Sequence, residues 1–188
     1  FTPTPAYAIL SGLVGSEMCI RDRNNWGPLI MSNEEINRKI AVIFATDLVG
    51  YSKHMEKDEN ATLRGLRECN KIIEPLIKKQ KGRIFNTGGD SVFAEFPSAV
   101  AAVNTAVEFQ KQIKARNDKD TTEVKLEYRI GINMGDVVKQ GDANLMGDGV
   151  NVAARLEALA QPGGITISKN VYDLVANKTK YELSLIHI

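Results

Sequence analysis

Two aspartates lie beside apolar segments that are typical of β-strands, and carboxylates in such positions can bind metal ions. Asp47 directly follows the β-branched apolar run 40–46 (IAVIFAT). Asp90 follows the paired glycines of the alternating segment 83–96 (RIFNTGGDSVFAEF). Mg²⁺ prefers oxygen ligands and commonly takes one or two protein carboxylates together with substrate phosphates. If the two segments are neighbours in one sheet, the carboxylates predict a cation site suited to a nucleoside triphosphate.

Each aspartate also has a simpler interpretation. Aspartate is common as the N-terminal cap of a helix, which would account for Asp47. It is equally common beside glycine in a turn, which would account for Asp90. From these two residues alone, both interpretations stay open.

Two further groups of residues are suited to phosphate. Backbone amides follow the first strand where a helix is expected to start, and such amides bind phosphate oxygens. The residues that carry them are Val49, Gly50, Tyr51 and Ser52. Asn151 and Arg155 are four residues apart and therefore share one face of a predicted helix. The arginine suggests stabilisation of phosphoryl charge, whereas the alternative is a surface ion pair with Glu157.

Short strands and amphipathic helices must position these residues. Apolar residues recur at helical spacing in three segments, 58–80, 98–114 and 148–160, and a last helix follows residue 168. Continuous or alternating apolar runs predict the strands. The expected strands and loops are 40–46, a hairpin within 83–96, a polar loop at 117–122, a strand at 124–133, a turn at 135–136, a strand at 137–139, a glycine-rich loop at 141–149 and a strand at 165–168.

The order of these elements is strand, helix, hairpin, helix, hairpin, helix, strand. This order favours a mostly antiparallel sheet covered by helices over a doubly wound parallel sheet. The expected fold class is therefore α+β.

Length and charge are those of one soluble domain. The chain has 188 residues, of which 43% are hydrophobic and 25% charged, and its formal net charge is +1. This charge gives no reason to expect a nucleic-acid partner or a polybasic membrane contact. Cys19 and Cys69 lack metal-ligand spacing and predict neither a disulfide framework nor a zinc site, which fits a reducing cytoplasm.

The two ends differ from the rest of the chain. The apolar stretch near the N-terminus is too short to span a membrane and lacks the charged lead of a signal peptide. The strings SGLVGSEMCIRDR and LSLIHI resemble translated sequencing-adapter read-through. We therefore expect a non-native or disordered leader at 1–30, the domain proper at 31–182 with its native sequence broken off near residue 182, and a non-native tail at 183–188.

Four strings, in this order, closely resemble the class III adenylate and guanylate cyclase domain in its bacterial form. They are FATDLVGYSKHM, GRIFNTGGDSVFAEFPSAVAAV, YRIGINMGDV and GDGVNVAARLEALAQPGGITIS. The resemblance covers roughly residues 38–181. It implies a ferredoxin-like α+β fold and a cytoplasmic enzyme that converts ATP or GTP to a 3′,5′-cyclic nucleotide and pyrophosphate.

The resemblance also implies roles for the residues. Asp47 and Asp90 would bind two Mg²⁺ or Mn²⁺ ions, assisted by the backbone carbonyl of Leu48. One ion would activate the ribose 3′-hydroxyl, and the other would hold the triphosphate. Asn151 would orient the ribose and Arg155 would offset transition-state charge, both from a second protomer. Activity would therefore require a homodimer.

The sequence departs from the family at two positions that select the base. Adenylate cyclases usually have lysine and aspartate where this chain has Asn86 and Asn144. An amide can donate and accept, but neutral hydrogen bonds have about half the strength of charge-assisted ones. Guanylate cyclases typically have glutamate and a small residue at these positions. The resemblance therefore favours ATP, with weakened selectivity.

A phosphate-contacting lysine of the family would lie beyond Tyr181, so the resemblance predicts weak turnover for this chain.

Other hypotheses stay open. A guanylate cyclase is one alternative, and a degenerate domain that binds nucleotide or a partner without turnover is another. The Gly-Gly-Asp turn also resembles that of diguanylate cyclases, although Ser91 and Val92 replace the glutamate and phenylalanine expected there.

Overall fold

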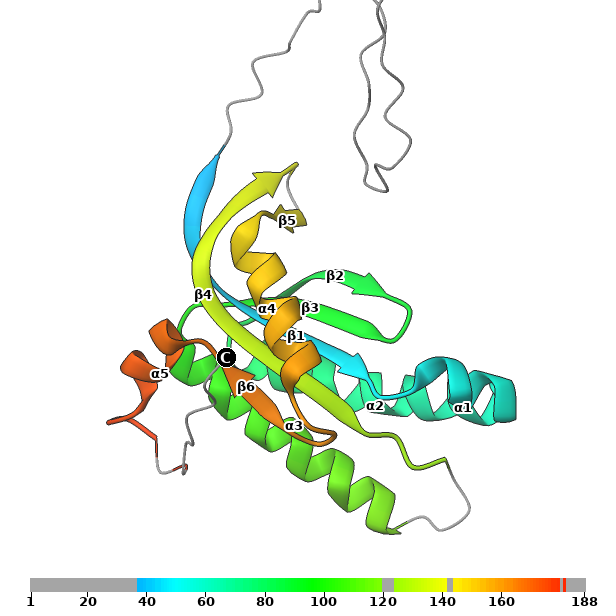
Figure 1. Ribbon diagram of the computed structural model, residues 1–188. Helices are drawn as coiled ribbons and strands as arrows, with labels where there is room; N and C mark the ends of the chain where they lie inside the picture. Colours follow the sequence, from blue (N-terminus) through cyan, green and yellow to red (C-terminus); the bar gives the residue numbers. More distant parts are fainter. Residues whose placement is uncertain (1–36, 120–123, 142–143, 180, 182–188) are drawn as a thin grey trace, which may run out of the picture. The chain divides into compact units, whose positions relative to one another are not determined.

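The structure is a computed structural model that describes residues 37–119, 124–141, 144–179 and 181. In chain order the elements are β1 Arg38–Leu48, α1 Tyr51–Lys57, α2 Glu59–Lys79, β2 Arg83–Gly88, β3 Ser91–Phe96, α3 Ala99–Lys119, β4 Tyr128–Gln140, β5 Asn144–Met146, α4 Asp148–Leu159, β6 Ile165–Ile167 and α5 Lys169–Val175 (Figure 1). The expectations for 1–30 and 183–188 fall outside the described residues.

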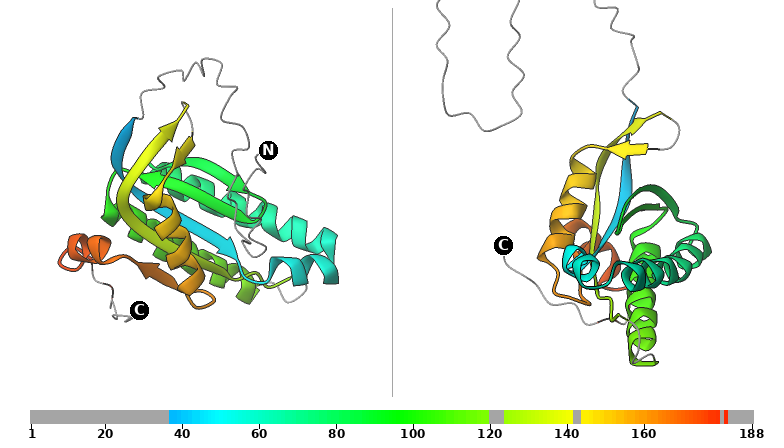
Figure 2. Two further views of the ribbon diagram at one scale, coloured as in Figure 1. Left: turned by 45° about the horizontal axis from the view of Figure 1, so that its top comes forward. Right: turned by 90° about the vertical axis from the view of Figure 1, so that its right-hand side faces the viewer.

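The described strands form one sheet in the order β2-β3-β1-β4-β5. Strand β6 pairs with residues 130–132 near the start of β4, on the same side as β5, which pairs with residues 138–140 near its end. The β4–β6 pairing is parallel and the other pairings are antiparallel. Helices α2 and α3 cover one face of the sheet and α4 lies on the other (Figure 2). The predicted α+β class is confirmed.

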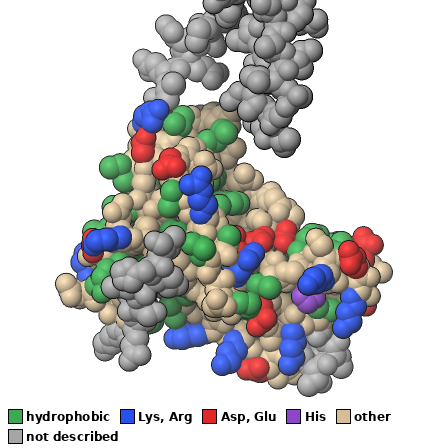
Figure 3. Space-filling model, viewed as in Figure 1, with side chains coloured by type: hydrophobic (Ala, Val, Ile, Leu, Met, Phe, Trp, Pro, Cys, Tyr) green, Lys and Arg blue, Asp and Glu red, His purple; other side chains and the backbone are tan. Residues whose placement is uncertain are grey.

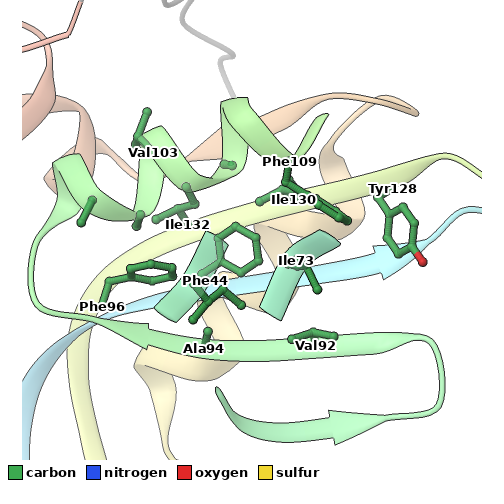
Figure 4. Close-up of a cluster of buried hydrophobic side chains, with 14 of the residues drawn as sticks. Phe44, Ile73, Val92, Ala94, Phe96, Val103, Phe109, Tyr128, Ile130 and Ile132 are labelled. Atoms are coloured by element: carbon green, nitrogen blue, oxygen red, sulfur yellow. The ribbon is translucent and has the colours of Figure 1, made fainter. Parts of the chain in front are cut away.

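Strand β1 is buried on both faces. Residues 41–46 are all buried, which explains their unbroken apolar run. Val42, Phe44 and Leu48 enter a cluster with α2 and α3, whereas Ala41, Ile43 and Ala45 enter a second cluster with α4. In the first cluster, the rings of Phe44 and Phe96 have their centroids 5.8 Å apart (Figure 4). The centre of the sheet therefore depends on β1.

The predicted helices are present, with some shifted ends. Helix α2 starts where the Asp58 carboxylate accepts a hydrogen bond from a first-turn amide at 2.9 Å. The Ser98 hydroxyl accepts a comparable hydrogen bond at 3.2 Å before α3. These caps satisfy amides that have no partner within the helix. Helix α3 continues to Lys119, so residues 117–119, expected in a loop, are helical. The short helix α1 begins at Tyr51, at the helix start expected after the first strand, although its extent to Lys57 was not predicted.

Strand β4 corrects two sequence predictions. It begins at Tyr128 instead of 124, and it continues without a turn to Gln140. The pair 135–136, interpreted as a turn, lies within the strand and pairs with β1. The chain reverses after β4 instead, where Gly141 has a φ of 61°, and β5 pairs back along β4.

Glycines on β4 allow the close approach of helix α4. A Cβ at Gly131 would lie 2.2 Å from the carbonyl oxygen of Ala153 and 2.3 Å from the amide nitrogen of Glu157. A Cβ at Gly135 would lie 3.3 Å from the Cα of Gly149. The glycine that indicated a turn therefore makes room for helix backbone.

Charges of both signs are mixed on the surface. Figure 3 shows acidic and basic side chains interspersed over one face and not gathered by sign. This agrees with the formal net charge of +1. Within the part of the chain that the structure describes, no helix has the length and apolar character needed to cross a bilayer.

We predict that Gly131→Ala weakens the packing of α4. The new methyl group would overlap backbone atoms of the helix, which cannot rotate away as a side chain can. We expect a loss of roughly 1–3 kcal/mol in the free energy of unfolding, measured by urea denaturation. Gly88→Ala is the control, because a Cβ at that strand glycine meets nothing within 4 Å. Equal stability of the two variants would contradict the packing.

Glu95 links three neighbouring strands. Its carboxylate pairs with Lys39 of β1 and, at 3.1 Å, with Arg83 of β2. Burial acts to raise the pKa of Glu95, but the hydrogen bonds from the two cations outweigh it and hold the pKa below the ordinary 4.5. Its stabilising contribution is therefore present above pH 4.5 and is lost as the pH falls through the lowered pKa.

We predict that Glu95→Gln lowers the free energy of unfolding by about 1 kcal/mol or less at neutral pH, because part of the site is solvated. The difference from wild type should shrink when the pH is lowered from 7 to about 3, because the carboxyl becomes increasingly protonated as the pH falls through its lowered pKa. Urea denaturation at the two pH values measures it. Glu74→Gln, at an exposed position of α2, serves as the control. A loss that is independent of pH would show that charge is not the cause.

Candidate functional site

Asp47 lies near the end of β1, on the face of the sheet that α4 covers. It is opposite Arg129 in the β1–β4 register, so both side chains leave the sheet on that face. Its Oδ1 accepts a hydrogen bond from the Ser91 hydroxyl at 2.7 Å. Its Oδ2 lies 3.5 Å from Nη2 of Arg129. Both neighbouring strands, β3 and β4, therefore hold the Asp47 carboxylate.

Asp90 lies in the tight turn between β2 and β3. Gly89 precedes it with a φ of 65°. Thr46 of β1 is opposite Val92 of β3, so this turn meets the end of β1. Burial and repulsion by Asp47 both raise the pKa of Asp90. The structure thus brings Asp47 and Asp90 together, and we refer to them as the carboxylate pair.

The carboxylate pair is a donor set suited to a divalent cation. A cation at this position would neutralise the repulsion that raises the pKa of Asp90. Across the described residues, no group of three or more His, Cys, Asp and Glu side chains is placed to hold a metal ion. Further ligands would therefore be oxygens of the backbone, such as the Leu48 carbonyl, of water, or of a bound phosphate.

Residues 49–52 connect β1 to α1. The Val49 amide donates to the carbonyl of Glu127 at 2.8 Å, so it is occupied within the fold. Gly50, with a φ of 68°, lies directly before α1. Tyr51 and Ser52 form the first turn, where amides have no partner within the helix. Of the predicted phosphate-binding amides, those at the start of α1 are the better placed.

Asn151 and Arg155 share the outer face of α4. Both residues are exposed, and among the described residues neither side chain forms a hydrogen bond or an ion pair. The alternative ion pair between Arg155 and Glu157 is not formed. Glu157 pairs with Arg129 instead, with Nε and Oε1 2.9 Å apart. Within one chain, α4 therefore presents Asn151 and Arg155 to solvent and not to the carboxylate pair.

Asn86 and Asn144 lie on the outermost strands of the sheet path, β2 and β5. Asn86 is exposed and opposite Phe93 of β3. The Asn144 side-chain oxygen accepts a hydrogen bond from the Leu145 amide at 3.0 Å, so the oxygen is already engaged with neighbouring backbone. The Asn86 side chain is therefore free to hydrogen-bond a nucleotide base, whereas the Asn144 side-chain oxygen already accepts a hydrogen bond.

Three residues around Asp47 were not predicted as part of the site: Ser91, Arg129 and Glu157. Ser91 and Arg129 contact Asp47, and Glu157 contacts Arg129. Burial raises the pKa of Glu157, although Arg129 acts to lower it. The alternation of β4 could have shown which face Arg129 occupies, because Ile130 beside it is buried on the opposite face. Its partners lie on other elements, so no local pattern identified them.

The chain is similar to known proteins over most of its length. Residues 32–186 match the family model described as the adenylate and guanylate cyclase catalytic domain. The Rhizobium meliloti (strain 1021) protein named "Putative adenylate cyclase 3" is 43% identical over 150 residues. These residues are 79% of this chain but only 25% of that protein, so the match concerns one part of a longer relative.

Two solved structures share the fold. The crystal structure of an adenylate/guanylate cyclase/hydrolase from Silicibacter pomeroyi has a TM-score of 0.70 at 37% identity, over 77% of this chain and 84% of that one. The crystal structure of the adenylyl cyclase CyaB from P. aeruginosa has a TM-score of 0.68 at 28% identity, with the same two coverages of 77% and 84%.

Proposed function

This chain belongs to the adenylate and guanylate cyclase catalytic domain family, and from that premise we propose that it converts ATP to 3′,5′-cyclic AMP and pyrophosphate at a site shared by two copies of the chain. The observation that carries the proposal is the carboxylate pair, formed where the β2–β3 turn meets the end of β1. Two carboxylates and a triphosphate repel one another, so they can share a site only with cations between them.

Asp47 and Asp90 hold the cations in this proposal, with the Leu48 carbonyl as a further ligand. Bound Mg²⁺ or Mn²⁺, two ions per site, would acidify the ribose 3′-hydroxyl and neutralise charge on the departing pyrophosphate. Ser91 orients the Asp47 carboxylate through its hydrogen bond before any ligand binds. The amides at the start of α1 donate to phosphate oxygens.

A partner protomer completes the site. Asn151 and Arg155 are exposed and without side-chain partners in the described part of one chain, so their outer face of α4 is open to a second copy. In a two-fold homodimer, each α4 supplies these side chains to the carboxylate pair of the other protomer. Asn151 then hydrogen-bonds the ribose, and Arg155 offsets phosphoryl charge in the transition state.

Asn86 and Asn144 contact the base in this proposal. Neutral amides can donate to and accept from adenine, but they discriminate less strongly than a charged pair. The name of the Rhizobium meliloti relative supports ATP. GTP is the second candidate, because neither asparagine carries the charge that would exclude it, and the Silicibacter pomeroyi structure is described under both activities.

We predict that Asp90→Ala and Arg155→Ala each abolish cyclic nucleotide formation, and that mixing the two variants restores it. Each variant lacks a different half of the site, so a mixed dimer has one complete site. Random exchange of protomers should recover about a quarter of wild-type activity. Cyclic product and pyrophosphate are measured with ATP or GTP in the presence of Mn²⁺. Lys111→Ala, at an exposed position of α3, should remain active.

Mixed variants that dimerise but stay inactive would contradict the shared site. A folded dimer that forms no product from either nucleotide would contradict the cyclase proposal and favour nucleotide binding without turnover.

A further inference from the structure

One guanidinium group lies between two carboxylates from different elements. Nε of Arg129 is 2.9 Å from Oε1 of Glu157 on α4, and Nη2 of Arg129 is 3.5 Å from Oδ2 of Asp47 on β1. Both carboxylates form ion pairs with the same cation. The shorter contact is to Glu157, so Arg129 is drawn toward the helix and away from the strand end.

The fold holds Glu157 in this position. Glu157 is buried, and its side chain is 11% exposed against 27% for that of Asp47. The close approach of α4 at Gly131 fixes how close Glu157 lies to β4, because the Glu157 amide nitrogen is only 2.3 Å from the position that a Cβ of residue 131 would occupy. A partly buried ion pair is screened less by salt and water than an exposed one, so this contact competes effectively for the guanidinium.

The ability of Asp47 to bind a cation depends on whether Arg129 lies closer to Asp47 or to Glu157. A guanidinium that binds Asp47 fully would occupy the carboxylate oxygens that a divalent cation needs, and it would add positive charge at the same place. A guanidinium drawn to Glu157 leaves those oxygens to the cation and still limits the movement of the Asp47 side chain through the 3.5 Å contact.

We propose that Glu157 is a positioning residue that acts through Arg129: by drawing the guanidinium away from Asp47, it keeps the carboxylate pair able to bind a divalent cation. This inference rests on the proposed function, because it takes the carboxylate pair to be the cation site. It assigns to the buried face of α4 a task separate from that of Asn151 and Arg155 on its outer face.

The test is a double-mutant cycle on the whole chain, with Mn²⁺ alone as the probe and free Mn²⁺ measured by electron paramagnetic resonance. Within the part of the chain that the structure describes, Glu157→Gln leaves Asp47 as the one carboxylate partner of Arg129. Mn²⁺ affinity should therefore fall roughly three- to tenfold. Arg129→Met removes the competing cation, and affinity should rise by a similar factor. In the Arg129→Met background, Glu157→Gln should have little further effect.

Controls separate this inference from a merely structural role. Asp173→Asn changes the net charge by the same amount at an exposed pair on α5 and should leave Mn²⁺ affinity unchanged. Thermal unfolding of every variant checks the fold. Arg129→Met leaves the buried Glu157 carboxylate unpaired, which costs stability. If Arg129→Met fails to fold, Arg129→Gln, alone and combined with Glu157→Gln, provides the same comparison.

Several outcomes would overturn the proposal. If Glu157→Gln lowers stability without changing Mn²⁺ affinity, the Arg129–Glu157 pair is structural only. If Glu157→Gln weakens Mn²⁺ binding equally with and without Arg129, Glu157 acts by its charge alone and not through Arg129. Asp90→Asn separates failure of this inference from failure of the proposed function. It should weaken Mn²⁺ binding in the wild-type background. If it does not, the carboxylate pair is not the cation site, and the proposed function fails as well.

Discussion

Helix α4 can lie directly on strand β4 because residue 131 has no side chain. A Cβ there would lie 2.2 Å and 2.3 Å from backbone atoms of the helix. The same close approach brings Glu157 over Arg129 and leaves Asn151 and Arg155 on the outer face of α4. One packing constraint therefore determines both what surrounds the carboxylate pair within the chain and what the chain can offer to a second copy.

The carboxylate pair is locally unfavourable, as the raised pKa of Asp90 shows. The fold nevertheless keeps the two carboxylates together. Five consecutive residues of β1 pair with β3, and this pairing places the β2–β3 turn beside the end of β1. Backbone hydrogen bonds and a core buried on both faces of β1 outweigh the repulsion between two partly solvated carboxylates. Charge arrangements that a fold maintains against repulsion are typical of functional sites.

Helix α4 has a different environment on each side. Its inner side supplies Glu157 to the sheet of its own chain, whereas its outer side carries the residues that we propose to serve a partner. Because the helix is short and lies against backbone of β4, a displacement of one side moves the other. In a dimer of the proposed kind, each protomer would thus contribute to two sites through a single helix.

Local sequence patterns determined the elements and the location of the aspartates. The apolar run 40–46 and the alternation of 83–96 placed Asp47 at the end of one strand and Asp90 in the turn of a hairpin, because the burial of strand residues leaves a direct trace in the sequence. The pairing of β1 with β3 then brought the two aspartates together. Only the tertiary structure decided what Gly135 and Arg129 do. A glycine that makes room for a packed helix looks the same in the local sequence as a glycine in a turn. The partners of an arginine depend on packing between elements that are far apart in the sequence.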